Sequence, residues 1–388
     1  ANVCNFLPII PIRTIYDNYS SIRHQKNDEL CNVDSIQSLL SNNYQFEDEE
    51  NNSVEHITLA GDAASIKRMT ESGNSAIYTF LAVPLKKKKK PLAIHVLPTK
   101  NGSSGRDIVN RCNCITSCIE KNSRFIVDYI ATDGDIGFDC LHRDFFLIIE
   151  PIINSKITYK EKINQMITFT HIPVNDPLHL FKNGRSHLLN HPLMVDPQTM
   201  RCVNMELYQK ATGLTKEIYD RSNIASMKDF YALSIFSWEN FQKLIENNRY
   251  DGAFYNLPFV FMIQAITSNV LNRFDRLSLL ENAIKYFIFH LNNVRKSHSR
   301  DFFTPSYHKS SIGTLFGEEI FIIRNINTCI ALSIALLRND EVAFSRIGSH
   351  AVESHFGLVR LFSHFNNTFE NAVNATINSI LLKDVCYK

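Results

Sequence analysis

The sequence FIVDYIATDG, residues 125–134, is a strongly apolar strand pattern followed by a turn. Its first eight residues are mostly β-branched or aromatic, as in a strand buried inside a sheet. Asp133 and Gly134 then end the run with residue types that favour turns. The elements on either side of this strand decide the fold class.

Three strand patterns and one helix pattern precede it. Residues 55–62, EHITLAGD, alternate with the two-residue period of a strand, and β-rich runs follow at Ile77–Leu85 and Leu92–Leu97. Arg106–Glu120 then repeats apolar residues on one helical face. The five lysines at 86–90 indicate a solvated hairpin tip, with a phosphate-contacting loop as the alternative.

A helix, a strand and another helix follow it. Leu141–Ile149 has the pattern of a helix and Met166–Val174 that of a strand. Asp176 and Pro177 offer an N-cap with proline at the first helical position, which predicts a helix to about Leu189. This order of elements predicts an α/β fold in which helices cover a mixed sheet.

The rest of the chain is predicted to be mostly helical. From about Met205 to Arg338, apolar residues recur with the 3.6-residue period of helices. We therefore divide the chain into four parts. These are an N-terminal segment and linker (1–53), the first part of the α/β core (54–200), a helical insertion domain (201–345), and a core-completing helix with a C-terminal tail (346–388).

The composition favours some classes of protein over others. With 44% hydrophobic and 21% charged residues, a folded core is expected. No apolar run approaches the roughly 18–20 residues of a membrane-spanning helix, so we expect a soluble intracellular protein with no membrane partner. The nine scattered cysteines are expected to be small buried residues in a reducing compartment. A net charge of +2 counts against nucleic-acid binding unless the basic residues gather on one face.

Three acidic residues could form a metal site. Asp62 lies in the first strand and Asp133 ends the fourth, and adjacency of these strands would bring the two carboxylates together. Glu353, on a later helix, is the best candidate for a third ligand. Carboxylates suit Mg²⁺, and two such cations promote phosphodiester cleavage by activating the attacking oxygen and stabilising the leaving one.

Each of these acids also has a structural interpretation. An Asp before Gly, such as Asp133, is a common turn residue, and Glu353 taken alone is typical of a helix surface. For Asp62 a functional interpretation is favoured, because an acid within an apolar strand is costly to bury without a partner. Three other acids stay open as alternatives: Asp135, Glu318 and Glu319.

Four segments resemble P-element-like transposases and their THAP-domain relatives. NDPLHLFKNGR at 175–185 resembles their Asp-Pro-x-His-Leu-x-Lys-Asn-x-Arg motif, and ATDG at 131–134 resembles the Ser-Asp-Gly that ends their fourth strand. ESHFGLVR at 353–360 is similar to their Glu-x-x-Phe-x-x-x-Arg helix, and residues 7–15 are similar to their Leu-Pro-Ser-x-Arg-Thr-Leu segment. The matches follow the family's order over most of the chain.

The resemblance implies a ribonuclease-H-like mixed sheet interrupted by a large all-α insertion. It also implies DNA transposase chemistry on double-stranded transposon ends, in the nucleus and in a homo-oligomer, with Asp62, Asp133 and Glu353 holding Mg²⁺ or Mn²⁺. Five further residues carried over from it lie next to the site or contact DNA phosphate: Asp176 and His179 next to the site, and Lys182, Arg185 and Arg360 at the phosphate. Their alternative interpretation is an N-cap, a packed histidine and solvated cations.

The chain departs from the family at three places. Ala63 and Ala64 follow the first Asp, where the family usually has Gly or a small hydrophobic residue, and the zinc-coordinating THAP module is absent. His350 stands where relatives often have an Asp associated with guanine nucleotide binding, so GTP use is doubtful. Two functions stay open: an active metal-dependent transposase or nuclease, and a decayed or domesticated remnant that binds DNA or protein. A helical scaffold with an unrelated α/β domain is a third interpretation.

Overall fold

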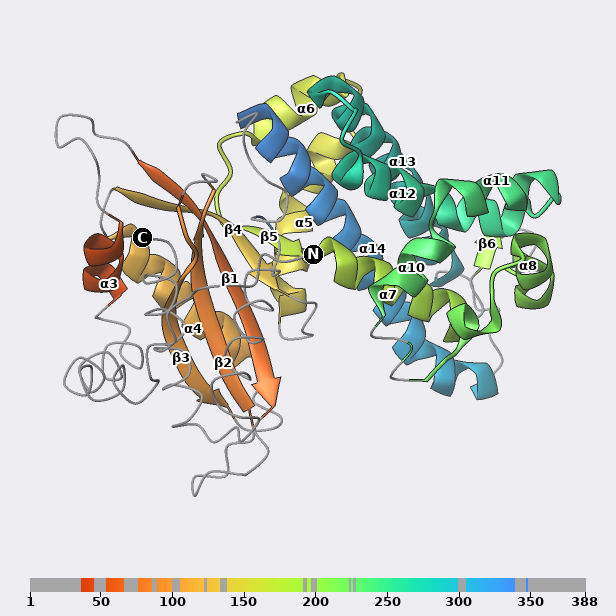
Figure 1. The fold of residues 1–388 in the computed structure, drawn as a ribbon, viewed down its shortest axis with the longest axis horizontal. Coiled ribbons are helices and arrows are strands. Elements are labelled where there is room, and N and C mark those ends of the chain that lie inside the picture. The colour runs from red at the N-terminus through yellow and green to blue at the C-terminus, as the bar shows by residue number, and fades with distance from the viewer. Residues whose placement is uncertain are drawn as a thin grey trace, which may run out of the picture.

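The computed structural model of the protein describes residues 36–44, 54–65, 76–85, 89–99, 105–121, 124–132, 138–190, 194–196, 201–222, 225, 228–298, 305–338 and 347. It consists of an α/β part built on one large sheet and, beside it, a mostly helical part (Figure 1). Several predictions fall outside the described residues: those for Asp133, Glu353 and Arg360, for the segment 7–15, and for the helices expected after residue 345.

The sheet has five strands in the order β3-β2-β1-β4-β5. Its strands are β1 (Glu55–Ser65), β2 (Ala76–Pro84), β3 (Leu92–Thr99), β4 (Phe125–Thr132) and β5 (Ile172–Asn175). The pairs β1/β2 and β2/β3 are antiparallel, whereas β1/β4 and β4/β5 are parallel. The predicted α/β class with a mixed sheet is therefore confirmed, and β4 has the predicted bounds.

Two helices complete the hydrophobic core around the first four strands. Helix α4 (Gly105–Glu120) packs against β4, and α3 (Ile36–Asn43) packs against β3 and α4. The predicted apolar stripe of α4, which includes Cys112 and Ile115, is buried in this core. An amphipathic helix is held in this way mainly by burial of its apolar face.

A second hydrophobic core joins the other edge of the sheet to the helical part. It contains apolar residues of α5 (Asp139–Ile153), α6 (Tyr159–Met166), β5 and α7 (Pro177–Asn190). Most of the remaining members come from the helical part: α8 (Met205–Thr212), the 3-10 helix η3 (Lys216–Tyr219), α10 (Asp229–Ile235), α11 (Trp238–Glu246), α12 (Tyr250–Thr267), α13 (Arg273–His298) and α14 (Pro305–Arg338). A short hairpin of β6 (Met194–Asp196) and β7 (Arg201–Cys202) precedes α8.

The long helix α14 connects these two parts. It packs against α13 of the helical part and against β5, α5 and α6 of the α/β part. Its segment Glu319–Arg338 is long and apolar enough to cross a membrane, with a mean hydropathy of 1.9, which corrects the expectation that no such run exists. Because 94% of this segment is buried inside the protein, it is a core helix in this structure.

The region before β5 differs from the prediction. Met166–Val174 was predicted to be a strand, but Met166 ends helix α6 and only Ile172–Asn175 is a strand. A capping box starts α6: the Thr158 hydroxyl accepts a hydrogen bond from the Glu161 N–H, and the Glu161 carboxylate accepts one from the Thr158 N–H. The sequence TYKE carries the signature of this cap, so α6 was predictable from it.

Candidate functional site

The parallel strands β1, β4 and β5 end side by side at one edge, which we call the carboxyl edge. Gly61 of β1 pairs with Thr132 of β4, and Thr132 pairs with Asn175 of β5. Asp62 directly follows Gly61, and the Asp176 N–H donates a hydrogen bond of 3.1 Å to the Thr132 carbonyl. Two of the predicted acidic residues therefore flank the end of β4, the strand that Asp133 follows in the sequence.

Asp62 is a buried acid inside β1. The residue is 9% exposed, and its partner across the antiparallel pair is Thr79 of β2. The residue before it, Gly61, lies beneath two aromatic rings of β2. A Cβ atom at Gly61 would lie 2.9 Å from the Tyr78 ring and 3.0 Å from the Phe80 ring, so the rings leave no room for a larger residue.

Asp176 caps helix α7. Its Oδ1 accepts a hydrogen bond of 2.9 Å from the Leu178 N–H, and its carbonyl accepts one of 3.0 Å from the Leu180 N–H. The predicted N-cap, with Pro177 at the first helical position, is therefore confirmed. The same residue lies at the carboxyl edge.

Polar side chains of α14 and α5 are buried behind the carboxyl edge. Asn327 Nδ2 donates to the His142 carbonyl at 2.8 Å and to His142 Nδ1 at 3.2 Å, and Thr328 Oγ1 accepts a bond of 3.1 Å from the Asn175 N–H. Burial, helped by the nearby charge of Arg324, lowers the pKa of His142 to about 3. His142 is therefore neutral at physiological pH, which leaves a ring nitrogen able to accept from Asn327.

An ion pair lies at the start of α5. Arg324 of α14 pairs with Asp139, the first residue of α5, and the Arg324 side chain is only 8% exposed. The preceding residue, Phe138, packs on Tyr78 of β2 with ring centroids 6.4 Å apart. The start of α5 is thus held between α14 and the strand that covers Gly61.

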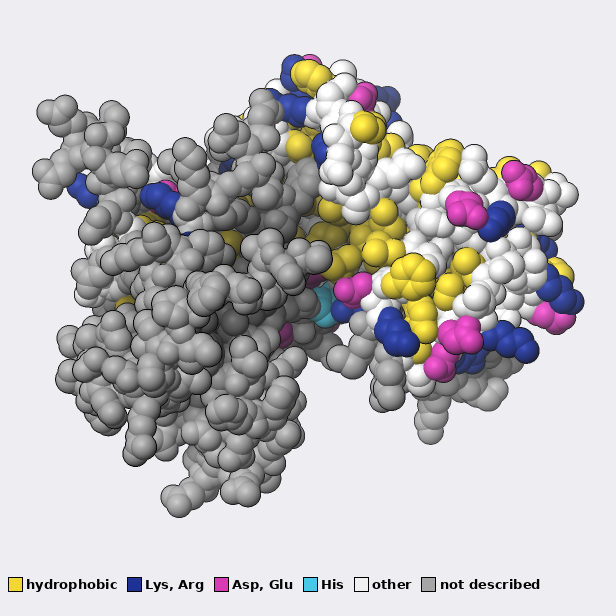
Figure 2. All heavy atoms as spheres, viewed as in Figure 1, with side chains coloured by type: hydrophobic (Ala, Val, Ile, Leu, Met, Phe, Trp, Pro, Cys, Tyr) yellow, Lys and Arg dark blue, Asp and Glu magenta, His cyan; other side chains and the backbone are white. Residues whose placement is uncertain are grey.

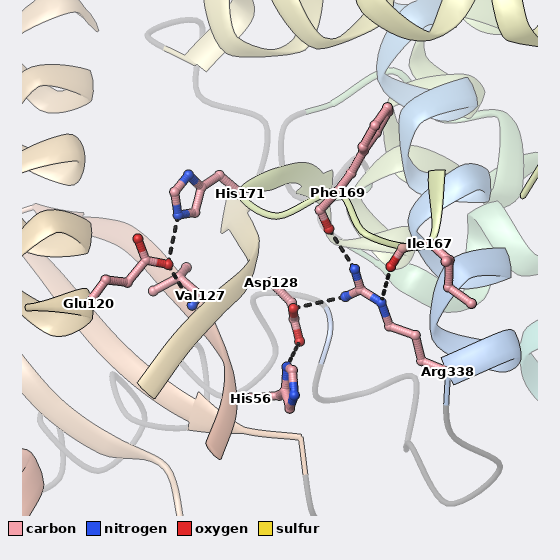
Figure 3. A network of polar contacts seen from close by, with 8 residues as sticks. All are labelled: His56, Glu120, Val127, Asp128, Ile167, Phe169, His171 and Arg338. Atoms are coloured by element: carbon pink, nitrogen blue, oxygen red, sulfur yellow. Dashed lines mark hydrogen bonds and ion pairs between the residues drawn. The ribbon is translucent and has the colours of Figure 1, made fainter. Parts of the chain in front are cut away.

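A second polar network lies at the other end of these strands, the amino edge (Figure 3). Asp128 of β4 is 2% exposed at its side chain, accepts a hydrogen bond from His56 Nδ1 of β1 at 2.9 Å, and forms an ion pair with Arg338 Nη1 of α14 at 2.8 Å. Arg338 also donates to the carbonyls of Ile167, at 2.7 Å, and Phe169, at 2.6 Å. The register of β1 with β4 shifts at Asp128, as in a β-bulge.

The sequence interpretation missed Asp128 although a signal was present. An acid inside the apolar run FIVDYIAT is as unusual as Asp62 in its own strand, because a buried carboxylate needs partners. Those partners, His56 and Arg338, lie far from it in the sequence and could not be identified there.

The basic residues of α7 are engaged within the protein. The Arg185 side chain is buried, with its Nε donating to the Ile218 carbonyl at 3.0 Å and its Nη2 donating to the carbonyls of Ile218, at 2.8 Å, and Asp220, at 2.5 Å. This corrects its assignment as a phosphate contact, because the guanidinium is already used inside the fold. Lys182 pairs with Asp229 of α10 at 3.1 Å, and His179 is half-buried.

Charges of both signs are mixed on the visible face of the helical part (Figure 2). Lys210 pairs with Glu206 and Lys243 with Glu239, each at 2.8 Å along one helix. At the sheet, Lys89 of the lysine run pairs with Glu55 at 2.7 Å. Each of these lysines is paired with an acid, and they do not form a basic stripe among the described residues.

Glu319 and the buried cysteines of α4 have the contacts of residues that stabilise the fold. Glu319, one of the alternative acids, pairs with Arg295 of α13 at 2.9 Å. Cys112 and Cys118 are buried in α4 while Cys114 is exposed, and burial raises the pKa of the Cys112 thiol to about 12. Within the described part of the chain, no group of three His, Cys, Asp or Glu side chains is arranged to hold a metal ion. Two of the three proposed ligands lie outside that part.

No protein-family model matches this chain, and no curated protein matches it.

Proposed function

We propose that the chain is the catalytic core of a DNA transposase with a ribonuclease-H-like fold, which cuts and joins DNA by metal-dependent phosphoryl transfer. One observation carries the proposal: the register of β1 with β4 sets Asp62 directly after the residue that pairs with the end of β4. Asp133 directly follows Thr132, the last residue of β4, in the sequence. The strand order β3-β2-β1-β4-β5 also supports this fold family.

The proposed ligands are carboxylates, which suit a divalent cation such as Mg²⁺ or Mn²⁺. Asp62 supplies a hard oxygen donor from the central strand of the sheet, where the residue is buried. We propose Asp133 and Glu353 as the other ligands, on the strength of the sequence resemblance. When bound, the metal supplies charge that stabilises the attacking and leaving oxygens of the phosphodiester.

The chain's own residues have three roles in this proposal. Gly61 keeps β1 close to the rings of β2, so that the backbone before Asp62 is fixed. Asp176 orients the start of α7 by capping it, and its N–H holds the end of β4. Lys182 and Arg360 stay proposed contacts for DNA phosphate, whereas Arg185 no longer belongs to that set.

The proposal is tested by nicking of supercoiled plasmid in Mn²⁺. We expect nicking by the wild-type chain and a loss of at least about 100-fold in Asp62→Asn, Asp133→Asn and Glu353→Gln, because metal ions stabilise the transition state by several kcal/mol. Asp144→Asn, which changes an exposed acid of α5, is the matched control and should nick normally.

Equal nicking in Asp133→Asn and the wild type would overturn the proposal. Absence of nicking in a folded wild-type chain that binds DNA would favour the second candidate, a decayed or domesticated remnant. The near-balance of 41 basic and 39 acidic residues favours that candidate, since strong nucleic-acid binding usually needs an excess of basic residues.

A further inference from the structure

Helix α14 carries a polar face inside an otherwise apolar segment. Arg324, Asn327 and Thr328 stand at positions i, i+3 and i+4, which share one face of a helix. All three are buried in the segment whose mean hydropathy is 1.9. Burial of polar groups is unfavourable unless they are hydrogen-bonded, so this face needs specific partners.

Two of these side chains contact the start of α5, and the third contacts the end of β5 at the carboxyl edge. Arg324 pairs with Asp139, and Asn327 donates to the His142 carbonyl. Asp139 and His142 both lie in the first turn of α5. Thr328 accepts from the Asn175 N–H at the end of β5. The polar face of α14 therefore holds both the start of α5 and the end of β5.

From these contacts we propose that Arg324 and Thr328 are positioning residues for the carboxyl edge, through which the helical part sets the geometry of the site. The inference rests on the proposed function, because that edge carries Asp62 and Asp176. Arg324 acts through Asp139, which begins the helix after β4. Thr328 acts through the backbone of Asn175, the residue before Asp176.

The chain offers a matched control on the same helix. Arg338 is also an arginine of α14 that pairs with an aspartate, Asp128, but it lies 14 residues later (338 − 324) at the amino edge. A general loss of stability should affect both edges in both variants. A positioning role predicts that each arginine controls only its own edge.

Hydrogen–deuterium exchange of the full chain tests this difference. In Arg324→Met we expect amide exchange on the order of tenfold faster at residues 139–146 and 172–178, with residues 55–60 and 125–129 unchanged. In Arg338→Met we expect the reverse. Thr328→Val should affect mainly residues 172–178, and Arg324→Lys should lie between wild type and Arg324→Met because lysine keeps the charge without the planar fork.

Faster exchange at both edges in both arginine variants, or no change in either, would overturn the inference. If Arg324→Met does not fold, Arg324→Lys replaces it in the experiment. If Arg338→Met does not fold, His56→Gln replaces it, since His56 also belongs to the amino edge.

A plasmid-nicking series over Mn²⁺ concentration separates this inference from the proposed function. We expect Arg324→Met to raise the Mn²⁺ concentration needed for half-maximal nicking and Arg338→Met to leave it unchanged. If both variants match the wild type in this value, the inference is wrong while the proposed function stands. If the wild type does not nick but exchange responds at the predicted edge, the proposed function is wrong and the positioning role stands.

Discussion

At Gly61 the backbone of β1 passes beneath the rings of Tyr78 and Phe80, and Asp62 follows at once. A side chain at residue 61 would push β1 away from β2 next to the acid that the proposal needs. On the neighbouring strand β4, Asp128 is also buried and is held by an arginine and a histidine. Single residues therefore decide how the buried acids Asp62 and Asp128 are held in this sheet.

Gly61→Ala should destabilise the protein by about 1–3 kcal/mol, because the added methyl overpacks a filled site. Urea unfolding of the variant measures this cost. In a Phe80→Leu background the same substitution should cost less, because part of the ring contact is gone. An equal cost in both backgrounds would contradict the steric explanation.

His56 should make stability depend on pH. The hydrogen bond to Asp128, together with the charges of Asp128 and Glu55, raises the pKa of His56 above 6.5, against the opposing effects of burial and Arg338. A raised folded pKa stabilises fully below the unfolded value of 6.5, and this contribution is lost as pH rises through the folded pKa.

We therefore expect His56→Gln to be less stable than the wild type at pH 5.5 and closer to it at pH 8.5, by urea unfolding at both values. The His56 side chain is 48% exposed, so solvent screening keeps the effect small. A stability difference that grows with pH would contradict this assignment.

Among the elements, the strands were easier to predict from the sequence than their lateral contacts. The period of EHITLAGD and the apolar run FIVDYIAT predicted β1 and β4, since these patterns follow from burial within a sheet. The sequence did not show that Arg338 reaches Asp128, nor that Arg185 turns inward, because such contacts depend on how distant helices pack. Asp62 was placed correctly in a strand, whereas the roles of Asp133 and Glu353 stay predictions.

Arg338, at the end of α14, should hold this helix against the sheet. Arg338→Met leaves Asp128 buried with only His56 beside it, and removal of one partner of a buried pair typically costs about 3–5 kcal/mol. Calorimetric or urea unfolding should show this loss. Adding Asp128→Asn should recover part of it by removing the charge, and a purely additive double variant would contradict the pairing.

Over the whole molecule, α14 joins the sheet to the helical part at both edges of the parallel strands. It belongs to the same hydrophobic core as α5, β5 and α7, while its polar contacts reach Asp139 at one edge and Asp128 at the other. Figure 1 shows it running between the two parts of the protein. The helical part is therefore packed directly on the edge where we propose the metal site.

We propose that acids far apart in the chain form one divalent-metal site at the carboxyl edge. This proposal is tested most directly by Mn²⁺ binding, followed by electron paramagnetic resonance of the free ion, in the wild type, Asp62→Asn, Asp133→Asn, Glu353→Gln and Asp135→Asn. We predict that each of the first three substitutions weakens binding at least roughly tenfold, since loss of a partner in even the outer shell of a metal costs that much, and that Asp135→Asn binds like the wild type. Equal Mn²⁺ binding by all five proteins would contradict the account.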